Sequence, residues 1–231
     1  MDKSIFTGPV ALGDRAIVIR LGESIDAASF RHVQALLRHF DEFPSPAVVE
    51  CVPAFTTITI YYDPLRATFA EICSYIDSAL ASVDTSQSTP SRTMEIPVCY
   101  GGSFGSDLEF VSQQLGLTPE EVIEIHSSVD YLVHMLGFAP GFPYLGGLPE
   151  RIVMPRRATP RLKVPAGSVG LAGSQTGIYP IATPGGWQLI GRTPRALFRP
   201  AEKPPTLLAA GDTVRFRPIS AQEFHERCEY E

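Results

Sequence analysis

The stretch from Gly137 to Thr193 constrains the fold more than any other part of the chain, because it combines many glycines and prolines with apolar residues. Glycine supplies backbone conformations with positive φ, and proline fixes φ and removes a hydrogen-bond donor. Such a stretch forms neither a long helix nor a disordered linker. Its short apolar runs predict strands at Ser168–Ala172, Gly177–Ile181 and Trp187–Ile190. Strands this short, joined by tight turns, are typical of a small, irregular β-barrel.

The same part of the chain carries an uninterrupted block of positive charge. Between Arg151 and Ala201 there are eight basic residues and no Asp or Glu, although the whole chain has a net charge of −6. Guanidinium groups bind carboxylate or phosphate with two hydrogen bonds, and nearby prolines hold the backbone that presents them. We interpret Arg156, Arg157 and Arg161 as candidate ligands of a small anion, with a solvated basic loop as the alternative.

A polar segment between two glycines, Gly173 and Gly177, is a second candidate for binding. Hydroxyls, an amide and backbone N–H groups placed between strands can surround one small ligand, whereas a plain hairpin turn is the alternative. Trp187, the only tryptophan, is expected to form a wall of the core or of a pocket. The candidate binding residues of this group are Ser174, Gln175, Thr176 and Tyr179.

His126 and Ser103 are the two residues that invite a catalytic reading. Histidine is the side chain best suited to transfer protons near neutral pH, and His126 stands where a predicted helix ends. A histidine that bonds local backbone at a helix end is the alternative. The sequence Gly101–Gly105 matches the nucleophile pattern G-x-S-x-G, but no run of βα units surrounds it. We therefore expect a glycine turn before a helix and no nucleophilic role for Ser103.

The first third of the chain predicts a sheet with two helices on one face. Apolar residues alternate in the strand segments and recur at helical spacing in the helix segments. A ferredoxin-like α/β sandwich buries all of these stripes. The expected strands are Ala16–Leu21, Val48–Val52 and Phe55–Tyr62, and the expected helices begin at Asp26 and Phe69.

A polar segment without periodicity, residues 85–92, predicts a linker between two domains. The expected fold class is therefore α+β, with the ferredoxin-like sandwich at 1–84 and a β-barrel domain at 93–231. In the second domain we expect strands at Met94–Tyr100, Val129–Met135 and Thr213–Arg217, and helices at Ser106–Leu115, after Thr118 and after Ser220.

Composition excludes several classes of function. A net charge of −6 disfavours general nucleic-acid binding, and the basic block is too broken by proline and glycine to form a groove-reading helix. The N-terminal residues lack the apolar core of a signal peptide, and no run approaches the roughly 20 apolar residues of a membrane span. The four cysteines are widely spaced, which predicts reduced thiols rather than a zinc site or disulfides. We expect a cytoplasmic protein that binds neither nucleic acid nor membrane.

Several of these segments resemble one bacterial family. His126 and the segments LGFAPGFPYLGGLP (136–149), PRRATPRLKVPAGSVGLAGSQTGIYP (155–180) and TPGGWQLIGRTP (183–194) are similar to its signature. The family is variously named for the B subunit of 5-oxoprolinase (PxpB), for the KipI kinase inhibitor or for allophanate hydrolase subunit 1. The resemblance implies that residues 93–231 form a cyclophilin-like β-barrel of the carboxyltransferase subdomain C/D type.

The resemblance also implies a function: the B subunit of an ATP-dependent 5-oxoprolinase, which acts with the A and C subunits to hydrolyse 5-oxo-L-proline to L-glutamate. In this reading Arg157 and Arg161 hold the small anionic substrate, Gln175 and Thr176 orient its amide, and His126 moves a proton. No Walker A, kinase or biotin-carrier sequence occurs, so ATP would be used by the assembled complex, and no metal or biotin site is signalled. The alternative is an inhibitor that binds a sporulation histidine kinase. A prolyl-isomerase activity would rest on fold analogy alone.

Overall fold

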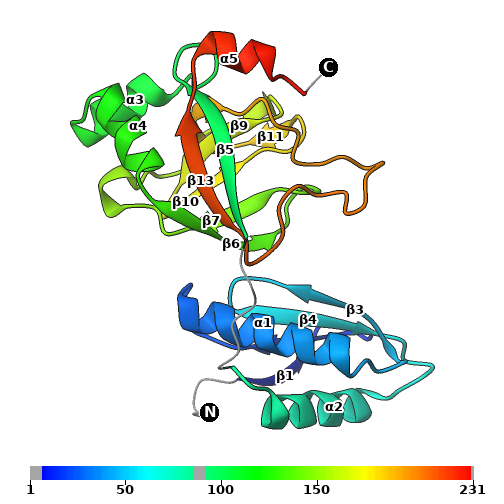
Figure 1. Cartoon of the computed structure of the whole chain (residues 1–231). Helices are drawn as coiled ribbons and strands as arrows, with labels where there is room; N and C mark the ends of the chain where they lie inside the picture. Colours follow the sequence, from blue (N-terminus) through cyan, green and yellow to red (C-terminus); the bar gives the residue numbers. More distant parts are fainter. Residues whose placement is uncertain (1–6, 86–91, 230–231) are drawn as a thin grey trace. The chain divides into compact units, whose positions relative to one another are not determined.

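The computed structural model describes residues 7–85 and 92–229. The chain divides into two compact units, Met1–Pro90 and Ser91–Glu231, coloured blue to cyan-green and green to red in Figure 1. Most of the expected linker at 85–92 lies outside the described residues.

The N-terminal unit is a ferredoxin-like sandwich whose four strands run in the order β1-β2-β4-β3. All neighbouring strands are antiparallel. Isoleucines on β2 and β4 share one core with apolar side chains of both helices, so α1 and α2 cover the same face of the sheet. The elements are β1 (Thr7–Ala11), β2 (Ala16–Arg20), α1 (Ala27–Glu42), β3 (Val48–Pro53), β4 (Thr57–Tyr62) and α2 (Phe69–Ser82).

The second unit contains a closed barrel of seven strands in the order β10-β7-β6-β13-β5-β12-β9. β13 runs parallel to β5, and the other neighbours are antiparallel. A separate two-stranded sheet pairs β11 with β8. The strands are β5 (Thr93–Tyr100), β6 (Asp130–Leu136), β7 (Pro143–Gly146), β8 (Arg161–Val164), β9 (Ser168–Ala172), β10 (Gln175–Ile178), β11 (Thr183–Gly185), β12 (Gln188–Arg192) and β13 (Thr213–Pro218).

Among the described residues, three α-helices accompany the barrel, and α3 and α4 contribute Leu108, Val111 and Val122 to its core. The expected end of α3 is confirmed, because Gly116 caps it with a left-handed φ of 66°. The expected start of α4 is confirmed as well, because Thr118 and Glu121 form a reciprocal capping box. The helices are α3 (Leu108–Leu115), α4 (Pro119–Ser127) and α5 (Ala221–Glu226), with a short 3₁₀ helix η2 (Glu150–Ile152).

The fold class is as expected, but several short strands differ from the sequence prediction. β1 and β7 were not expected, because each combines glycine and proline within four or five residues. β8 and β11 were not expected either, because strands of three or four residues show little periodicity. The strand expected at Gly177–Ile181 lies earlier, at β10, where it pairs with β7 and β9.

The segment Gly101–Gly105 forms a tight turn between β5 and α3. Gly101 and Gly102 have positive φ values of 68° and 51°, and Gly105 lies against the backbone of β12. Ser103 is exposed, and in the described part of the chain it has no hydrogen-bond partner. The geometry is that of a glycine turn leading into a helix.

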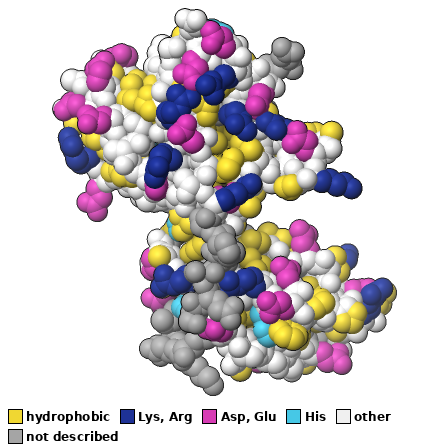
Figure 2. Space-filling model, viewed as in Figure 1, with side chains coloured by type: hydrophobic (Ala, Val, Ile, Leu, Met, Phe, Trp, Pro, Cys, Tyr) yellow, Lys and Arg dark blue, Asp and Glu magenta, His cyan; other side chains and the backbone are white. Residues whose placement is uncertain are grey.

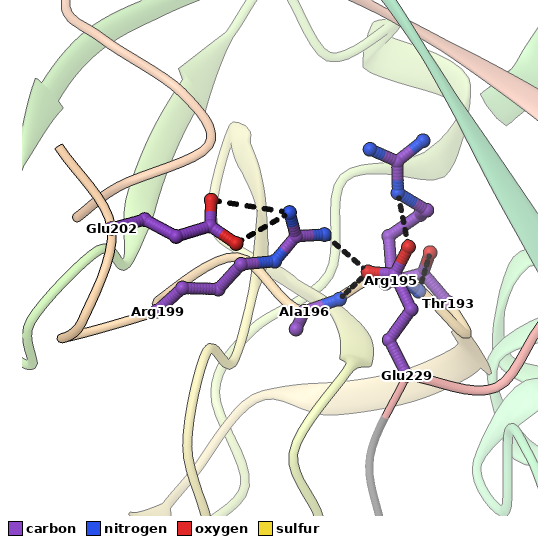
Figure 3. Close-up of polar contacts among 6 residues, drawn as sticks. All are labelled: Thr193, Arg195, Ala196, Arg199, Glu202 and Glu229. Carbon is purple, nitrogen blue, oxygen red and sulfur yellow. Dashed lines mark hydrogen bonds and ion pairs between the residues drawn. The ribbon is translucent and has the colours of Figure 1, made fainter. Parts of the chain in front are cut away.

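The segment after α5 is tied to the loop that follows β12 through the carboxylate of Glu229 (Figure 3). This group accepts a hydrogen bond from the backbone amide of Ala196 at 2.8 Å. It also pairs with the guanidinium groups of Arg195 and Arg199. Burial raises the pKa of Glu229, but these hydrogen bonds and charges outweigh it and hold the pKa below its usual value.

Gly105 should be intolerant of any side chain. A Cβ atom there would lie 2.0 Å from the carbonyl oxygen of Ile190, and backbone cannot move aside as a flexible side chain can. We expect Gly105→Ala to lower the free energy of unfolding by about 3 kcal/mol, measured by urea denaturation. Gly186→Ala is the control, because its nearest contact would be an ordinary 3.6 Å. Equal stability of the two variants would contradict this packing.

Candidate functional site

Asp107, directly before α3, joins three segments of the second unit. Its side chain is 6% exposed. Oδ1 accepts hydrogen bonds from Arg157 Nη1 at 3.1 Å and from Arg161 Nη2 at 2.6 Å. Oδ2 accepts the backbone N–H of Leu189 at 2.7 Å. A buried carboxylate is stable only when it is paired and hydrogen-bonded in this way. Two arginines expected to hold an external anion therefore already bind an internal one.

Half of the six remaining basic residues of the block are also bound from elsewhere in the chain. Arg192 donates to the carbonyl of Ala166 at 2.7 Å, and Arg195 and Arg199 pair with Glu229. On the face of this unit visible in Figure 2, basic and acidic side chains are interspersed. Among the described residues, those of the block without an ion pair or a side-chain hydrogen bond are Arg151, Arg156 and Lys163.

Arg156 and Arg157 line a hollow of about 290 Å³ whose other walls are largely aromatic. We call it the aromatic pocket. The ring of Phe142 is one of these walls, and its centroid lies 5.2 Å from that of Tyr179 and 5.4 Å from that of Trp187, both nearly edge-on. Such edge-to-face contacts stabilise aromatic clusters beyond the burial of their area. The aromatic side chains of the pocket are Phe138, Phe142, Tyr144, Tyr179 and Trp187.

Gly185 lets the rings of the aromatic pocket approach the backbone. A Cβ atom at Gly185 would lie 2.3 Å from the hydroxyl oxygen of Tyr179. Gly185 therefore permits the packing of this pocket. Trp187 lines the pocket, in agreement with the sequence prediction that it forms a wall.

Arg156 brings a free positive charge to the aromatic pocket. Its side chain is exposed, and it forms no ion pair or hydrogen bond with the described residues. Burial raises the pKa values of Tyr144 and Tyr179, and the charge of Arg156 acts on both in the opposite direction. Arg156 also lines a wider, more open hollow beside α3, which is bounded by Phe110 and Gln188. The pocket thus combines flat apolar walls with one unpaired guanidinium, an arrangement that suits a small ring bearing a carboxylate.

His126 lies in the core of the barrel unit, with no exposed surface. The hydroxyl of Thr176 donates to the carbonyl of Gly170 at 3.1 Å, so its oxygen accepts the N–H of His126 Nε2 at 3.0 Å. Nδ1 of His126 then accepts the hydroxyl of Tyr100 at 2.8 Å. Each polar atom in this chain of hydrogen bonds has a partner, and the imidazole is held as the neutral Nε2–H tautomer.

The surroundings of His126 favour a structural role. Its ring stacks on Phe216 at 4.5 Å, and burial lowers its pKa from 6.5 to about 3. An enclosed, neutral imidazole with both nitrogens occupied cannot reach a ligand in this conformation. The catalytic role assigned from sequence stays a prediction, and the geometry gives it no support.

The polar residues at the β9–β10 turn, expected to form one binding group, face different directions in the structure. Successive residues of a strand face opposite sides, so Thr176 points into the barrel while Gln175 does not. Ser174 is exposed at the tip of the turn. Nε2 of Gln175 is buried without a hydrogen-bond partner among the described residues. Of the residues expected from sequence, the structure brings Arg156, Arg157 and Tyr179 to one pocket and leaves Arg161, Ser174, Gln175, Thr176 and His126 outside it.

No group of three or more His, Cys, Asp or Glu side chains within residues 7–85 and 92–229 is arranged to hold a metal ion. Over the same ranges, no helix has the length and apolar character needed to cross a bilayer.

Comparison with known proteins places the chain in a family. Residues 9–208 match the family described as the carboxyltransferase domain, subdomain C and D. The chain belongs to this family. Within it, the chain is similar to the B subunit of 5-oxoprolinase from Bacillus subtilis (strain 168), with 50% identity over 224 residues that cover 93% of each chain. The family membership expected from sequence is confirmed.

Two further proteins resemble the chain over most of its length. The chain is 47% identical to the 5-oxoprolinase B subunit of Escherichia coli O157:H7, over 90% of this chain and 94% of that one. A solved structure of the protein TTHA0988 shows the same fold, with 36% identity and a TM-score of 0.80. It covers 90% of this chain, which spans 40% of the TTHA0988 chain.

Sequence reasoning missed Asp107, Phe138, Phe142 and Tyr144. In the sequence Asp107 falls at the start of the helix expected at Ser106–Leu115, and nothing local shows that a residue 50 positions away is its partner. The aromatic residues carried a weak signal, because several of them in a short Gly/Pro-rich segment exceed what strand alternation needs.

The burial of His126 predicts a specific dependence of stability on pH. The unfolded chain protonates this histidine below about pH 6.5, whereas the folded chain resists protonation down to about pH 3. The folded state therefore loses about 1.4 kcal/mol per pH unit as the pH falls through this range. His126→Gln keeps one donor and one acceptor but does not titrate. The free energy of unfolding of this variant should therefore fall less steeply than that of the wild-type chain as the pH is lowered, and the difference in slope should correspond to one proton. Denaturant titrations at several pH values measure this slope. If the variant and the wild-type chain show equal slopes, His126 is protonated in the folded state, as a residue of a solvent-accessible site would be.

Proposed function

We propose that this chain is the B subunit of an ATP-dependent 5-oxoprolinase and that, with the A and C subunits, it hydrolyses 5-oxo-L-proline to L-glutamate. Relatives with this name are about half identical to the chain over nearly its whole length. The observation that carries the proposal is the aromatic pocket, where flat walls meet the unpaired guanidinium of Arg156.

The substrate's chemistry matches the pocket. 5-Oxo-L-proline is a flat five-membered lactam with one carboxylate. Its ring would lie against Phe142 and Trp187, and its carboxylate would meet Arg156 in a charge-assisted hydrogen bond. A pocket of about 290 Å³ has room for this small molecule and for an activating group from a partner protein.

The share of this chain in the reaction is binding rather than proton transfer. Hydrolysis of an unactivated lactam is energetically uphill, which is why ATP is consumed. The sequence contains no familiar ATP motif, so we assign ATP use to the assembled complex. Because His126 is enclosed, the groups that move protons would come from a partner. Inhibition of a histidine kinase stays a prediction, and no contact in the described residues favours it.

Arg156 provides the first test. We expect Arg156→Ala to raise KM for 5-oxo-L-proline in the assembled complex about tenfold to a hundredfold, because one charge-assisted hydrogen bond is lost. kcat should change little, as for a group that binds ground state and transition state alike. Arg151→Ala is the matched control, since Arg151 is exposed, unpaired among the described residues and absent from the pocket lining. If the two variants behave alike, Arg156 does not hold the substrate.

Dependence on partners provides the second test. The purified chain should release no glutamate from 5-oxo-L-proline, with or without ATP, and activity should appear only when the A and C subunits are added. The measurement is glutamate formed by each protein alone, by each pair and by the full mixture. Glutamate formation by this chain alone would contradict the proposal that the reaction needs the A and C subunits.

A further inference from the structure

Phe138 has a backbone conformation that its residue type disfavours. Its φ is 68°, and it is the one described residue other than glycine with a positive φ. The amide of Ala139 donates to the carbonyl of Gly137 at 2.8 Å, closing a three-residue turn around Phe138. A γ-turn with a positive central φ is rare and strained, and a bulky residue at its centre is an outlier.

The surrounding loop maintains this conformation. Residues 137–142 connect β6 with β7, and the amide of Gly137 donates to the carbonyl of Phe142 at 3.1 Å. The amide of Phe142 donates in turn to the carbonyl of Ala139 at 3.0 Å. Strained conformations of this kind persist only where neighbouring bonds impose them, and they concentrate at functional sites.

Burial does not explain why a phenylalanine stands there. Its side chain is 63% exposed, so the strain is not offset by removing the ring from water. Glycine would relieve the strain, and the chain uses glycine freely in this segment. The ring is therefore retained for its position rather than for the stability of the fold.

That position is the edge of the aromatic pocket. The Phe138 ring lies edge-on to Phe142 at 5.5 Å and to Tyr179 at 6.4 Å. It lines the same hollow as Arg156 and Trp187. An exposed apolar ring beside a free guanidinium gives the pocket one more flat wall next to its positive charge.

We infer that Phe138 is a specificity-determining residue of the aromatic pocket, and that its strained turn places the ring against a small cyclic carboxylate bound at Arg156. The identity of that ligand as 5-oxo-L-proline rests on the proposed function. The placement of the ring does not. Free cyclic carboxylates should be bound in preference to acyclic ones such as acetate, which cannot stack on the ring.

Trp187 offers a direct readout, because it is the only tryptophan in the chain and lines the pocket. The isolated wild-type chain is titrated with 5-oxo-L-proline while tryptophan fluorescence is recorded, and 2-pyrrolidinone and acetate serve as ligands lacking the carboxylate or the ring. We expect a saturable change with 5-oxo-L-proline and at least tenfold weaker binding of the other two. Phe138→Ala and Phe138→Gly should each weaken the binding of 5-oxo-L-proline about tenfold, whereas Phe69→Ala, which removes another exposed phenyl, should leave it unchanged.

The two Phe138 variants differ in one further measurement. Glycine ordinarily destabilises a protein relative to alanine, because the unfolded chain gains freedom. At a positive φ the order reverses, so Phe138→Gly should unfold at a temperature equal to or above that of Phe138→Ala. Weakened binding in both variants together with this reversed order supports the inference.

Two results would overturn it: wild-type affinity in both Phe138 variants, or no saturable change in the wild-type chain. The proposed function fails differently. If the isolated chain binds the ligand through Phe138 but the complete complex does not hydrolyse it, the inference holds and the function is wrong. If the complex is active and its KM is unchanged by Phe138→Ala, the function holds and the inference is wrong.

Discussion

The buried carboxylate of Asp107 is the interaction on which the arrangement of the site depends. It binds two guanidinium groups and one backbone amide, and so fixes the segment carrying Arg157 and Arg161 against β12. Removing one partner from a buried pair leaves an uncompensated charge, which makes such a junction intolerant of change. The neighbouring Arg156 lines the aromatic pocket and forms no ion pair or hydrogen bond with the described residues. The basic block thus contains arginines that are bound within the fold and, at the aromatic pocket, Arg156, which is available to a ligand.

Sequence reasoning reached the fold because apolar periodicity and capping residues are local signals. The amphipathic helix after Asp26, the capping box at Thr118 and the strand at Ser168–Ala172 all lie where their residues place them. The sequence did not predict the short strands at Pro143–Gly146 and Thr183–Gly185, because pairing with distant segments rather than local preference makes them strands.

The candidate site was harder to predict, because its contacts join residues far apart in the chain. The absence of acidic residues near Arg157 and Arg161 in the sequence suggested an empty anion site, yet Asp107 occupies their guanidinium groups. His126 resembles a proton carrier in sequence, but Tyr100 and Thr176 enclose it in a core network. Composition shows which charges and nucleophiles exist, whereas only packing decides which of them face solvent.

A crystal structure of the chain with 5-oxo-L-proline tests the central claim most directly. The account predicts the lactam ring between the aromatic walls, its carboxylate on Arg156, and Asp107 still bound to Arg157 and Arg161. A ligand whose carboxylate displaces Asp107 from those two arginines, or that lies outside the aromatic pocket, would contradict it.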